Sequence, residues 1–236
     1  MINSNSDLAK LLAKCDSLRQ KKNEQNGTPK PSELQDTKPN QDILRAAGIK
    51  RRYQSVTFSA IERRGIPTDD SIRRGYEKAK AYAEDLGANI AQGRGLILAG
   101  TYGTLKTTIS IAILRKWLDA GHGGVIVPMC SLIDNLCTMR ILNRDEFARY
   151  EHKIRTTSLL VLDDLGGEDT DQRWVLSKID SIITERYNDL LATIVTTNLT
   201  AKELEGTYSG RMLDRLKNTC DLIILNADSQ RRHLWE

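Results

Sequence analysis

The sequence predicts an α/β domain with a mostly parallel sheet flanked by helices. Short apolar runs at residues 95–99, 158–162 and 193–197 have the composition of buried strands, and stretches with helical apolar spacing separate them. A glycine-rich turn joins the first run directly to a helical stretch. Strands and helices that alternate in this way require parallel pairing with right-handed crossovers.

The first 46 residues are expected to stand apart from this domain. A helix is predicted within residues 1–22, with Ser6 as its N-cap and an apolar stripe formed by Leu8, Leu11, Leu12, Cys15 and Leu18. Such a short helix needs a partner, either another protein or the chain's own core. Residues 23–46 are polar and contain three of the five prolines, which predicts a flexible linker. Residues 47–236 then form the α/β domain.

Apolar spacing within this domain predicts the remaining elements in order. Helices are expected at residues 70–86, 107–120, 131–149 and 171–190. Further strands are expected at residues 124–127 and 222–225.

The turn after the first strand is a near match to a phosphate-binding loop. Residues 100–107 read GTYGTLKT, and the pattern G-x-x-x-x-G-K-[ST] fails only at Leu105, where the final glycine belongs. Backbone N–H groups of such a loop point at phosphate oxygens, Lys106 reaches the β- and γ-phosphates, and the Thr107 hydroxyl ligates Mg²⁺. The expected nucleotide-binding residues are Gly100, Gly103, Thr104, Leu105, Lys106, Thr107 and Thr108. The alternative is an ordinary strand, turn and helix with an unrelated Lys-Thr pair.

Paired carboxylates end the apolar run at residues 158–162. Asp163 and Asp164 follow it, at the carboxyl end of a buried strand, where ligands of open α/β sheets bind. Asp163 is expected to hold Mg²⁺, and Asp164 is expected to polarise the water that attacks the γ-phosphate. The alternative is a solvated strand end or a helix cap.

A polar amide ends the run at residues 193–197. Asn198 is suited to orient the attacking water beside the γ-phosphate. Taken alone, Asn198 is better explained as the first residue of a turn. Three strand ends that carry phosphate, magnesium and water ligands in this order nevertheless favour a nucleotide site.

Together these motifs resemble the DnaC/DnaI-type helicase loaders, which are AAA+ ATPases. The resemblance covers residues 47–232. It rests on AGI at 47–49, RY at 52–53, TF at 57–58, the loop at 100–107, LLVLDDLG at 159–166, ERY at 185–187 with IVTTN after it, GRMLDRL at 210–216 and NADSQR at 226–231.

The resemblance implies an AAA+ P-loop NTPase core, with little or no C-terminal lid because few residues follow Asn198. It also implies a protein that uses ATP and Mg²⁺ to deliver the ring-shaped, hexameric replicative helicase onto single-stranded DNA. Residues 1–22 are the part that this resemblance assigns to the helicase. IstB-type transposition helpers share the core, so recruitment of a transposase to DNA is an alternative function.

Two arginines acquire roles only through the resemblance. Arg215 is similar to the arginine finger that a neighbouring subunit inserts toward the γ-phosphate, which implies a homo-oligomer in the ATP state. Arg231 is similar to the sensor-2 arginine. A guanidinium fork suits both roles because it stabilises charge on phosphoryl oxygens. The alternative is that both belong to a solvated basic face.

The chain departs from the family pattern at two positions. At Leu105, a Cβ and an isobutyl group are expected to crowd the backbone where it must approach phosphate, which puts turnover in doubt. This departure leaves open a non-hydrolysing adaptor built on the same fold. Asp164 stands where many AAA+ proteins carry glutamate, so its shorter side chain must act at closer range.

Composition argues against several other classes. No apolar run approaches the ~18 residues of a membrane span, and the amino terminus lacks a secretory signal pattern. A cytoplasmic protein without a membrane partner is therefore expected. The four cysteines and three histidines show no metal-ligand spacing.

Charge is concentrated at the amino-terminal end. Residues 1–55 hold eleven Lys or Arg and six Asp or Glu, a net charge of +5, so the remainder carries −1 of the total +4. A nearly neutral core predicts local rather than broad contact with DNA. The candidates for this contact are Arg140, Arg144, Arg149, Lys153 and Arg155. The alternative is a solvated helix face.

Overall fold

A computed structural model describes residues 41–167 and 173–228 of the chain. The predicted helix at 1–22, most of the predicted linker and Arg231 lie outside the described residues. The described part begins with helix α2 (Gln41–Ala46), whose Leu44 is buried in the core. Residues 41–46 are thus helical where the sequence predicted the end of a linker, because Leu44 packs into the α/β domain.

A five-stranded parallel sheet forms the centre of this domain. Its strands are β1 (Gly95–Ala99), β2 (Gly124–Pro128), β3 (Leu159–Leu165), β4 (Ala192–Thr197) and β5 (Cys220–Ile224). They are ordered β2-β3-β4-β1-β5, and each neighbouring pair is parallel. Strands β3, β4 and β1 are therefore neighbours, which brings the three motif-bearing strand ends to one edge of the sheet.

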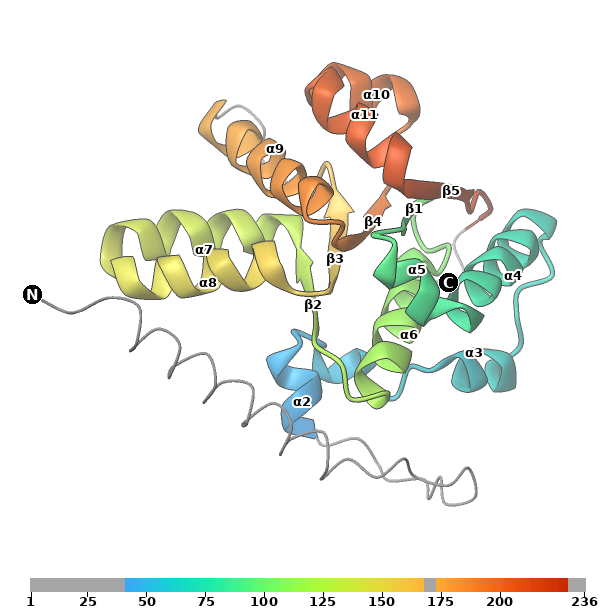
Figure 1. Cartoon of the computed structure of the whole chain (residues 1–236). Helices are drawn as coiled ribbons and strands as arrows, with labels where there is room; N and C mark the ends of the chain where they lie inside the picture. Colours follow the sequence, from blue (N-terminus) through green and yellow to red (C-terminus); the bar gives the residue numbers. More distant parts are fainter. Residues whose placement is uncertain (1–40, 168–172, 229–236) are drawn as a thin grey trace, which may run out of the picture. The chain divides into compact units, whose positions relative to one another are not determined.

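Helices cover both faces of the sheet (Figure 1). The first face carries α2, the 3₁₀ helix η1 (Arg51–Tyr53), α3 (Phe58–Arg64), α4 (Asp70–Glu84), α5 (Leu86–Ala91) and α6 (Lys106–Asp119). The second carries α7 (Met129–Leu142), α8 (Arg144–Thr156), α9 (Arg173–Asn188), α10 (Ala201–Thr207) and α11 (Gly210–Thr219). The fold is thus a sheet between two helical layers, as the alternating pattern predicted.

Burial on both faces explains the apolar composition of the strands. In β3, Leu159 and Val161 belong to the core cluster of the first face, whereas Leu160 and Leu162 belong to that of the second. Successive side chains of a strand point to opposite faces. Residues 159–162 of β3 are covered on both sides and are consequently apolar at every position rather than at alternate ones.

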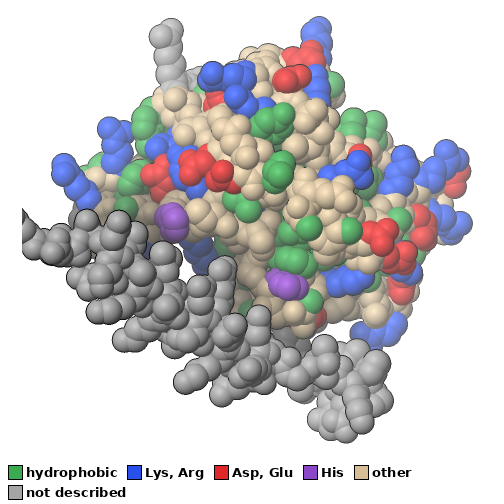
Figure 2. Space-filling view, viewed as in Figure 1, with side chains coloured by type: hydrophobic (Ala, Val, Ile, Leu, Met, Phe, Trp, Pro, Cys, Tyr) green, Lys and Arg blue, Asp and Glu red, His purple; other side chains and the backbone are tan. Residues whose placement is uncertain are grey.

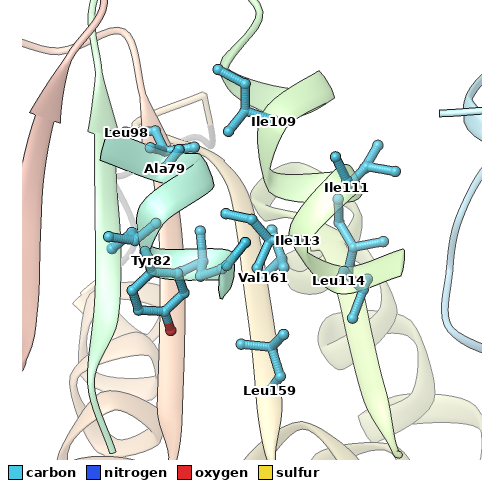
Figure 3. Packing of buried hydrophobic residues seen from close by; sticks show 14 of the residues in the cluster. Ala79, Tyr82, Leu98, Ile109, Ile111, Ile113, Leu114, Leu159 and Val161 are labelled. Carbon is cyan, nitrogen blue, oxygen red and sulfur yellow. The ribbon is translucent and has the colours of Figure 1, made fainter. Parts of the chain in front are cut away.

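Helix α6 follows the glycine-rich loop and is buried over most of its length. Ile109 and Ile113 are 0% exposed and share a cluster with Leu98 of β1 and Val161 of β3 (Figure 3). Protein interiors are close-packed, so such contacts resist displacement. The start of α6, and with it the loop, is therefore held against the ends of β1 and β3.

The helix expected at 70–86 is divided in the structure, because it ends at Glu84 and is followed by the separate α5. The helices expected around 131–149 are α7 and α8. Asn143 separates them, and its side chain accepts hydrogen bonds from the N–H groups of Asp145 and Glu146 and so starts α8. None of the helices in the described ranges is long and apolar enough to cross a membrane.

Candidate nucleotide site

The glycine-rich loop begins where β1 meets the end of β4. The N–H of Gly100 donates to the carbonyl of Thr197, 3.2 Å away. Gly100 has φ of +150°, and a Cβ there would lie 2.1 Å from the carbonyl oxygen of Leu225. Gly103 has φ of +78°, in the left-handed region that glycine tolerates. Glycine is thus required at position 100 by the approach of Leu225, and it is favoured at position 103 by the backbone angle.

Leu105 adopts a left-handed conformation directly before α6, with φ of 67° and ψ of 7°. This conformation costs a non-glycine residue roughly 1–2 kcal/mol. The Leu105 side chain is partly buried against the core of the first face. It also lines a cavity of about 580 Å³ together with Val56, Ile61 and Thr108. The backbone of Leu105 therefore lies in a region that glycine favours, and its isobutyl group lies in the wall of this cavity.

Lys106 is buried, and its ammonium lies within the loop. Its Nζ donates to the carbonyl oxygens of Gly100 at 2.8 Å and Thr101 at 2.6 Å. The hydroxyl of Thr104 donates to the same Thr101 carbonyl at 2.8 Å. The positive charge is thus concentrated where the loop would receive an anion.

Asp163 lies at the end of β3 beside the start of α6. Its Oδ1 accepts hydrogen bonds from Thr107 Oγ1 at 2.8 Å and from Thr196 Oγ1 at 2.7 Å. Burial raises the pKa of this carboxyl above its usual value, as does the nearby Asp164, while the two hydroxyls and Lys106 act in the opposite direction. A carboxylate oxygen next to a threonine hydroxyl provides two oxygen ligands that fit Mg²⁺, which prefers oxygen ligands.

An irregularity in β3 separates the two carboxylates. The pairing of β3 with β4 shifts register between Leu162 and Leu165, and Asp164 within this bulge has φ of +64°. The Asp164 N–H donates to Thr196 Oγ1 at 2.8 Å. Bulges re-aim side chains, and here Asp163 is half-buried whereas Asp164 is exposed.

Asn198 meets Asp164 across the ends of β4 and β3. The amide Nδ2 of Asn198 donates to Asp164 Oδ1 at 2.5 Å. The structure thus brings together Lys106, Thr107, Asp163, Asp164 and Asn198, which the sequence placed on three separate strand ends. The Asp164 carboxylate and the Asn198 amide are suited to hold a water molecule, which the carboxylate can deprotonate.

Thr196 is a member of this site that sequence analysis missed. Its hydroxyl donates to the carboxylate of Asp163 and accepts from the backbone of Asp164, so it fixes both carboxylates relative to β4. Thr196 is only 1% exposed. The threonines of β4 were the available signal, but the β-branched shape of threonine already explained their presence in a strand.

Arg215 lies on α11 and faces α9 of the same chain. Its guanidinium is 3.6 Å from Asp180 and lies 5.9 Å from the ring centroid of Tyr187. Arg211 forms a shorter ion pair with the same carboxylate, at 2.9 Å. Within the described residues, one buried nitrogen of Arg215, Nη1, has no hydrogen bond. The side chain is therefore docked on α9 rather than fully solvated.

The basic residues of α7 and α8 fall into two groups. These helices lie side by side (Figure 1). Arg155 pairs with Glu151 and Glu185, and Lys153 donates to the carbonyl of Ala46. Arg140, Arg144, Arg149 and Lys153 are exposed, whereas Arg155 is partly buried. On the face that Figure 2 shows, Lys and Arg are spread among Asp and Glu rather than gathered in one patch.

A family model described as "IstB-like ATP binding protein" matches residues 85–234. The replicative helicase loader DnaI of Bacillus subtilis (strain 168) is 24% identical over 186 residues, which cover 78% of this chain and 57% of that protein. The chain therefore spans less than two thirds of that relative's length.

Replication proteins are among the solved structures with a similar fold. The crystal structure of the DnaC helicase loader superposes with a TM-score of 0.66 at 24% identity, covering 75% of this chain and 99% of that one. AMPPCP-bound DnaA from Aquifex aeolicus gives a TM-score of 0.60 at 18% identity, covering 76% of this chain and 51% of that one. These likenesses show the fold, and the fold class predicted from the sequence is confirmed.

Proposed function

Since the chain belongs to the IstB-like ATP binding protein family, we propose that it is an ATP-regulated loader of the replicative DNA helicase. ATP binds at the carboxyl ends of β1, β3 and β4. The observation that carries the proposal is the hydrogen bond of 2.8 Å between Thr107 and Asp163. It joins the phosphate loop to the paired carboxylates, two motifs that lie 56 residues apart in sequence, at the edge where open α/β sheets bind ligands.

Binding uses the loop and the start of α6. The N–H groups of residues 103–108 and the positive end of the helix dipole attract the phosphates. Lys106 exchanges its loop carbonyls for phosphate oxygens, which are better partners for an ammonium because they are charged. Arg231 is proposed to contact the phosphates as a sensor.

Thr107 and Asp163 would hold Mg²⁺, which would neutralise charge on the phosphates. Asp164 takes the proton of the attacking water, and Asn198, already hydrogen-bonded to it, holds that water in line. Arg215 of a neighbouring subunit then approaches the γ-phosphate, which makes the ATP state a homo-oligomer.

The loader role requires two macromolecular partners, a helicase and single-stranded DNA. The relatives named for helicase loading support delivery of the hexameric helicase onto single-stranded DNA. Residues 1–22 grip the helicase, residues 23–40 tether them, and residues 41–236, which include helix α2, form the ATPase domain. Arg140, Arg144, Arg149 and Lys153 are the exposed candidates for DNA contact in the α7–α8 pair, and Arg155 is a partly buried one. A replication protein of this kind works in the cytoplasm.

Co-purification with a replicative helicase tests this proposal. The full chain and a version without residues 1–22 are each mixed with the hexamer in the presence of MgATP. The full chain should be retained and the shortened chain lost, while both bind ATP equally. Retention of the shortened chain would remove residues 1–22 from the interface, and failure of both would contradict the loader role.

A transposition helper is the second candidate, favoured by the description of the matching family model. Such a protein would coat duplex DNA as a filament and recruit a transposase. Electron microscopy of the chain with duplex DNA and ATP distinguishes the two functions. Long filaments without helicase binding would favour the helper.

A non-hydrolysing adaptor is the third candidate, favoured by Leu105. Steady-state phosphate release for the chain and for Leu105→Gly separates the adaptor from an ATPase. Release by the unaltered chain supports an ATPase, whereas release by the glycine variant alone supports the adaptor.

A further inference from the structure

The cavity beside the phosphate loop has features of a binding pocket. It measures about 580 Å³ and lies between the segment around α3 and the first turn of α6. Val56, Ile61, Pro67 and Leu105 give it apolar walls, and Ser55 and Arg64 add polar groups. Small-molecule pockets have this size and this mixture of many apolar side chains with a few polar ones.

Leu105 and Thr108 connect this cavity to the loop. Both line the cavity, and both are neighbours of the Lys106-Thr107 pair. A loop that holds phosphates at the helix start leaves the nucleoside, which is covalently attached to them, to occupy an adjoining space. In the described part of the chain, this cavity adjoins the loop on the side of Leu105.

The leucine changes the wall of that cavity. With glycine, the left-handed position before Lys106 would present only backbone, whereas Leu105 adds an isobutyl group that is only partly buried in the protein. Its remaining surface is available to a ligand. Leu105 has φ of 67°, which lies in the left-handed region that a glycine adopts without strain.

We infer that Leu105 is a specificity-determining residue that contacts the nucleoside end of the nucleotide, and not an obstacle to its phosphates. This inference rests on the proposed ATP binding. A planar base and an aliphatic side chain gain free energy when both leave water. Leu105 thereby shifts binding energy from the phosphate tail to the nucleoside.

The test compares MgATP with magnesium tripolyphosphate, which has the phosphates but no nucleoside. Affinities for both are measured on the full chain and on Leu105→Gly, with tripolyphosphate scored by its competition for bound ATP. The glycine variant should lose about tenfold in ATP affinity relative to tripolyphosphate, the effect of removing one apolar side-chain contact. Any general effect of glycine on the loop backbone changes both ligands equally and cancels in the ratio.

Two further variants make the result specific to the cavity. Val56→Ala, on the cavity wall outside the loop, should shift the ratio in the same direction, and Leu222→Ala, at an exposed position on β5, should leave it unchanged. A parallel change of both affinities in Leu105→Gly, or an unchanged ratio, overturns the inference. If Lys106→Ala binds ATP as well as the unaltered chain does, the proposed function itself fails.

Discussion

Burial and hydrogen bonding have opposite effects on the pKa of the Asp163 carboxyl. Burial has the larger effect, and the pKa is raised. A carboxyl whose pKa is higher in the folded than in the unfolded chain opposes folding once it is ionised. Stability therefore falls as pH rises from the pKa of the unfolded chain through that of the folded chain. At neutral pH the negative charge of Asp163 consequently lowers the free energy of unfolding of the protein without nucleotide. The same charge is what a bound Mg²⁺ would use.

Asp163→Asn should therefore raise the melting temperature of the protein without nucleotide at pH 7, because the charge is removed while an acceptor for Thr107 and Thr196 remains. The same variant should lose the dependence of ATP binding on Mg²⁺. Calorimetric melting and ATP titration with and without Mg²⁺ check both effects. A lower melting temperature would show that the hydrogen bonds depend on the negative charge.

Arg186 is a buried cation that joins several elements. It is 1% exposed, and its guanidinium donates to the carbonyls of Ile154, Arg155, Thr157 and Ala192 and to the hydroxyl of Thr193. It thereby satisfies the carboxyl end of α8 and fixes it to the start of β4.

Arg186→Met should reduce the free energy of unfolding by about 3 kcal/mol or more, because it leaves several buried carbonyl oxygens without donors. Urea unfolding measures the change. Arg149→Met, at an exposed position on α8, is the matched control and should change stability by less than about 0.5 kcal/mol. Equal stability of the two variants would contradict the structural role of Arg186.

At the scale of elements, the junction of β3 and β4 organises the carboxylates. Thr196 and Thr197 are adjacent buried threonines, and each hydroxyl has two partners. Thr196 contacts Asp163 and the Asp164 backbone, whereas Thr197 donates to the carbonyl of Leu165 and accepts from the N–H of Leu199.

Thr196→Val and Thr197→Val should each lower the free energy of unfolding by about 1–3 kcal/mol. Each replaces a hydroxyl by a methyl of similar shape and leaves the hydrogen-bond partners of that hydroxyl unsatisfied. Only Thr196→Val should also weaken Mg²⁺-dependent ATP hydrolysis, since it alone holds the carboxylates. Phosphate release at saturating ATP, compared at equal folded fractions, is the measurement. The same loss of hydrolysis in both variants would reduce Thr196 to a structural residue.

Elements differ in how far the sequence could predict them. Strands β1, β3 and β4 and helix α6 were predicted because apolar runs and helical spacing are local signals. Helices α2, α3, α5 and α10 have six or seven residues each and were not predicted. Helices this short depend on tertiary packing rather than on their own propensity.

The site shows the same division. Lys106, Thr107, Asp163 and Asn198 were predicted from spacing and strand ends, and the structure brings them together. The part played by Thr196 depends on the register of β4 against β3 and on the bulge at Asp164, which no local pattern encodes. The surroundings of the Leu105 side chain likewise depend on tertiary structure, because the cavity that it lines is formed with residues around α3.

At the scale of the whole molecule, the proposed catalytic set is incomplete in one subunit. Arg215 is docked on α9 of its own chain, against Asp180 and Tyr187. It acts only if a neighbouring copy places it beside the phosphates, so hydrolysis should require assembly.

Mixing two inactive variants tests this requirement. Arg215→Ala should bind ATP but hydrolyse it at least about 10³-fold more slowly, and Lys106→Ala should not bind it. A mixture should recover part of the activity, because Lys106→Ala subunits supply the arginine to intact sites. Absence of recovery, with both variants folded, would contradict an arginine contributed by a neighbour.

The most direct test of the nucleotide site is a calorimetric titration of the full chain with MgATP. Lys106→Ala and Lys78→Ala are titrated beside it, since Lys78 is an exposed lysine on α4. We expect saturable binding with one site per chain, abolished in Lys106→Ala and unchanged in Lys78→Ala. Binding that survives in Lys106→Ala, or no binding by the unaltered chain, would contradict a nucleotide site at the ends of β1, β3 and β4.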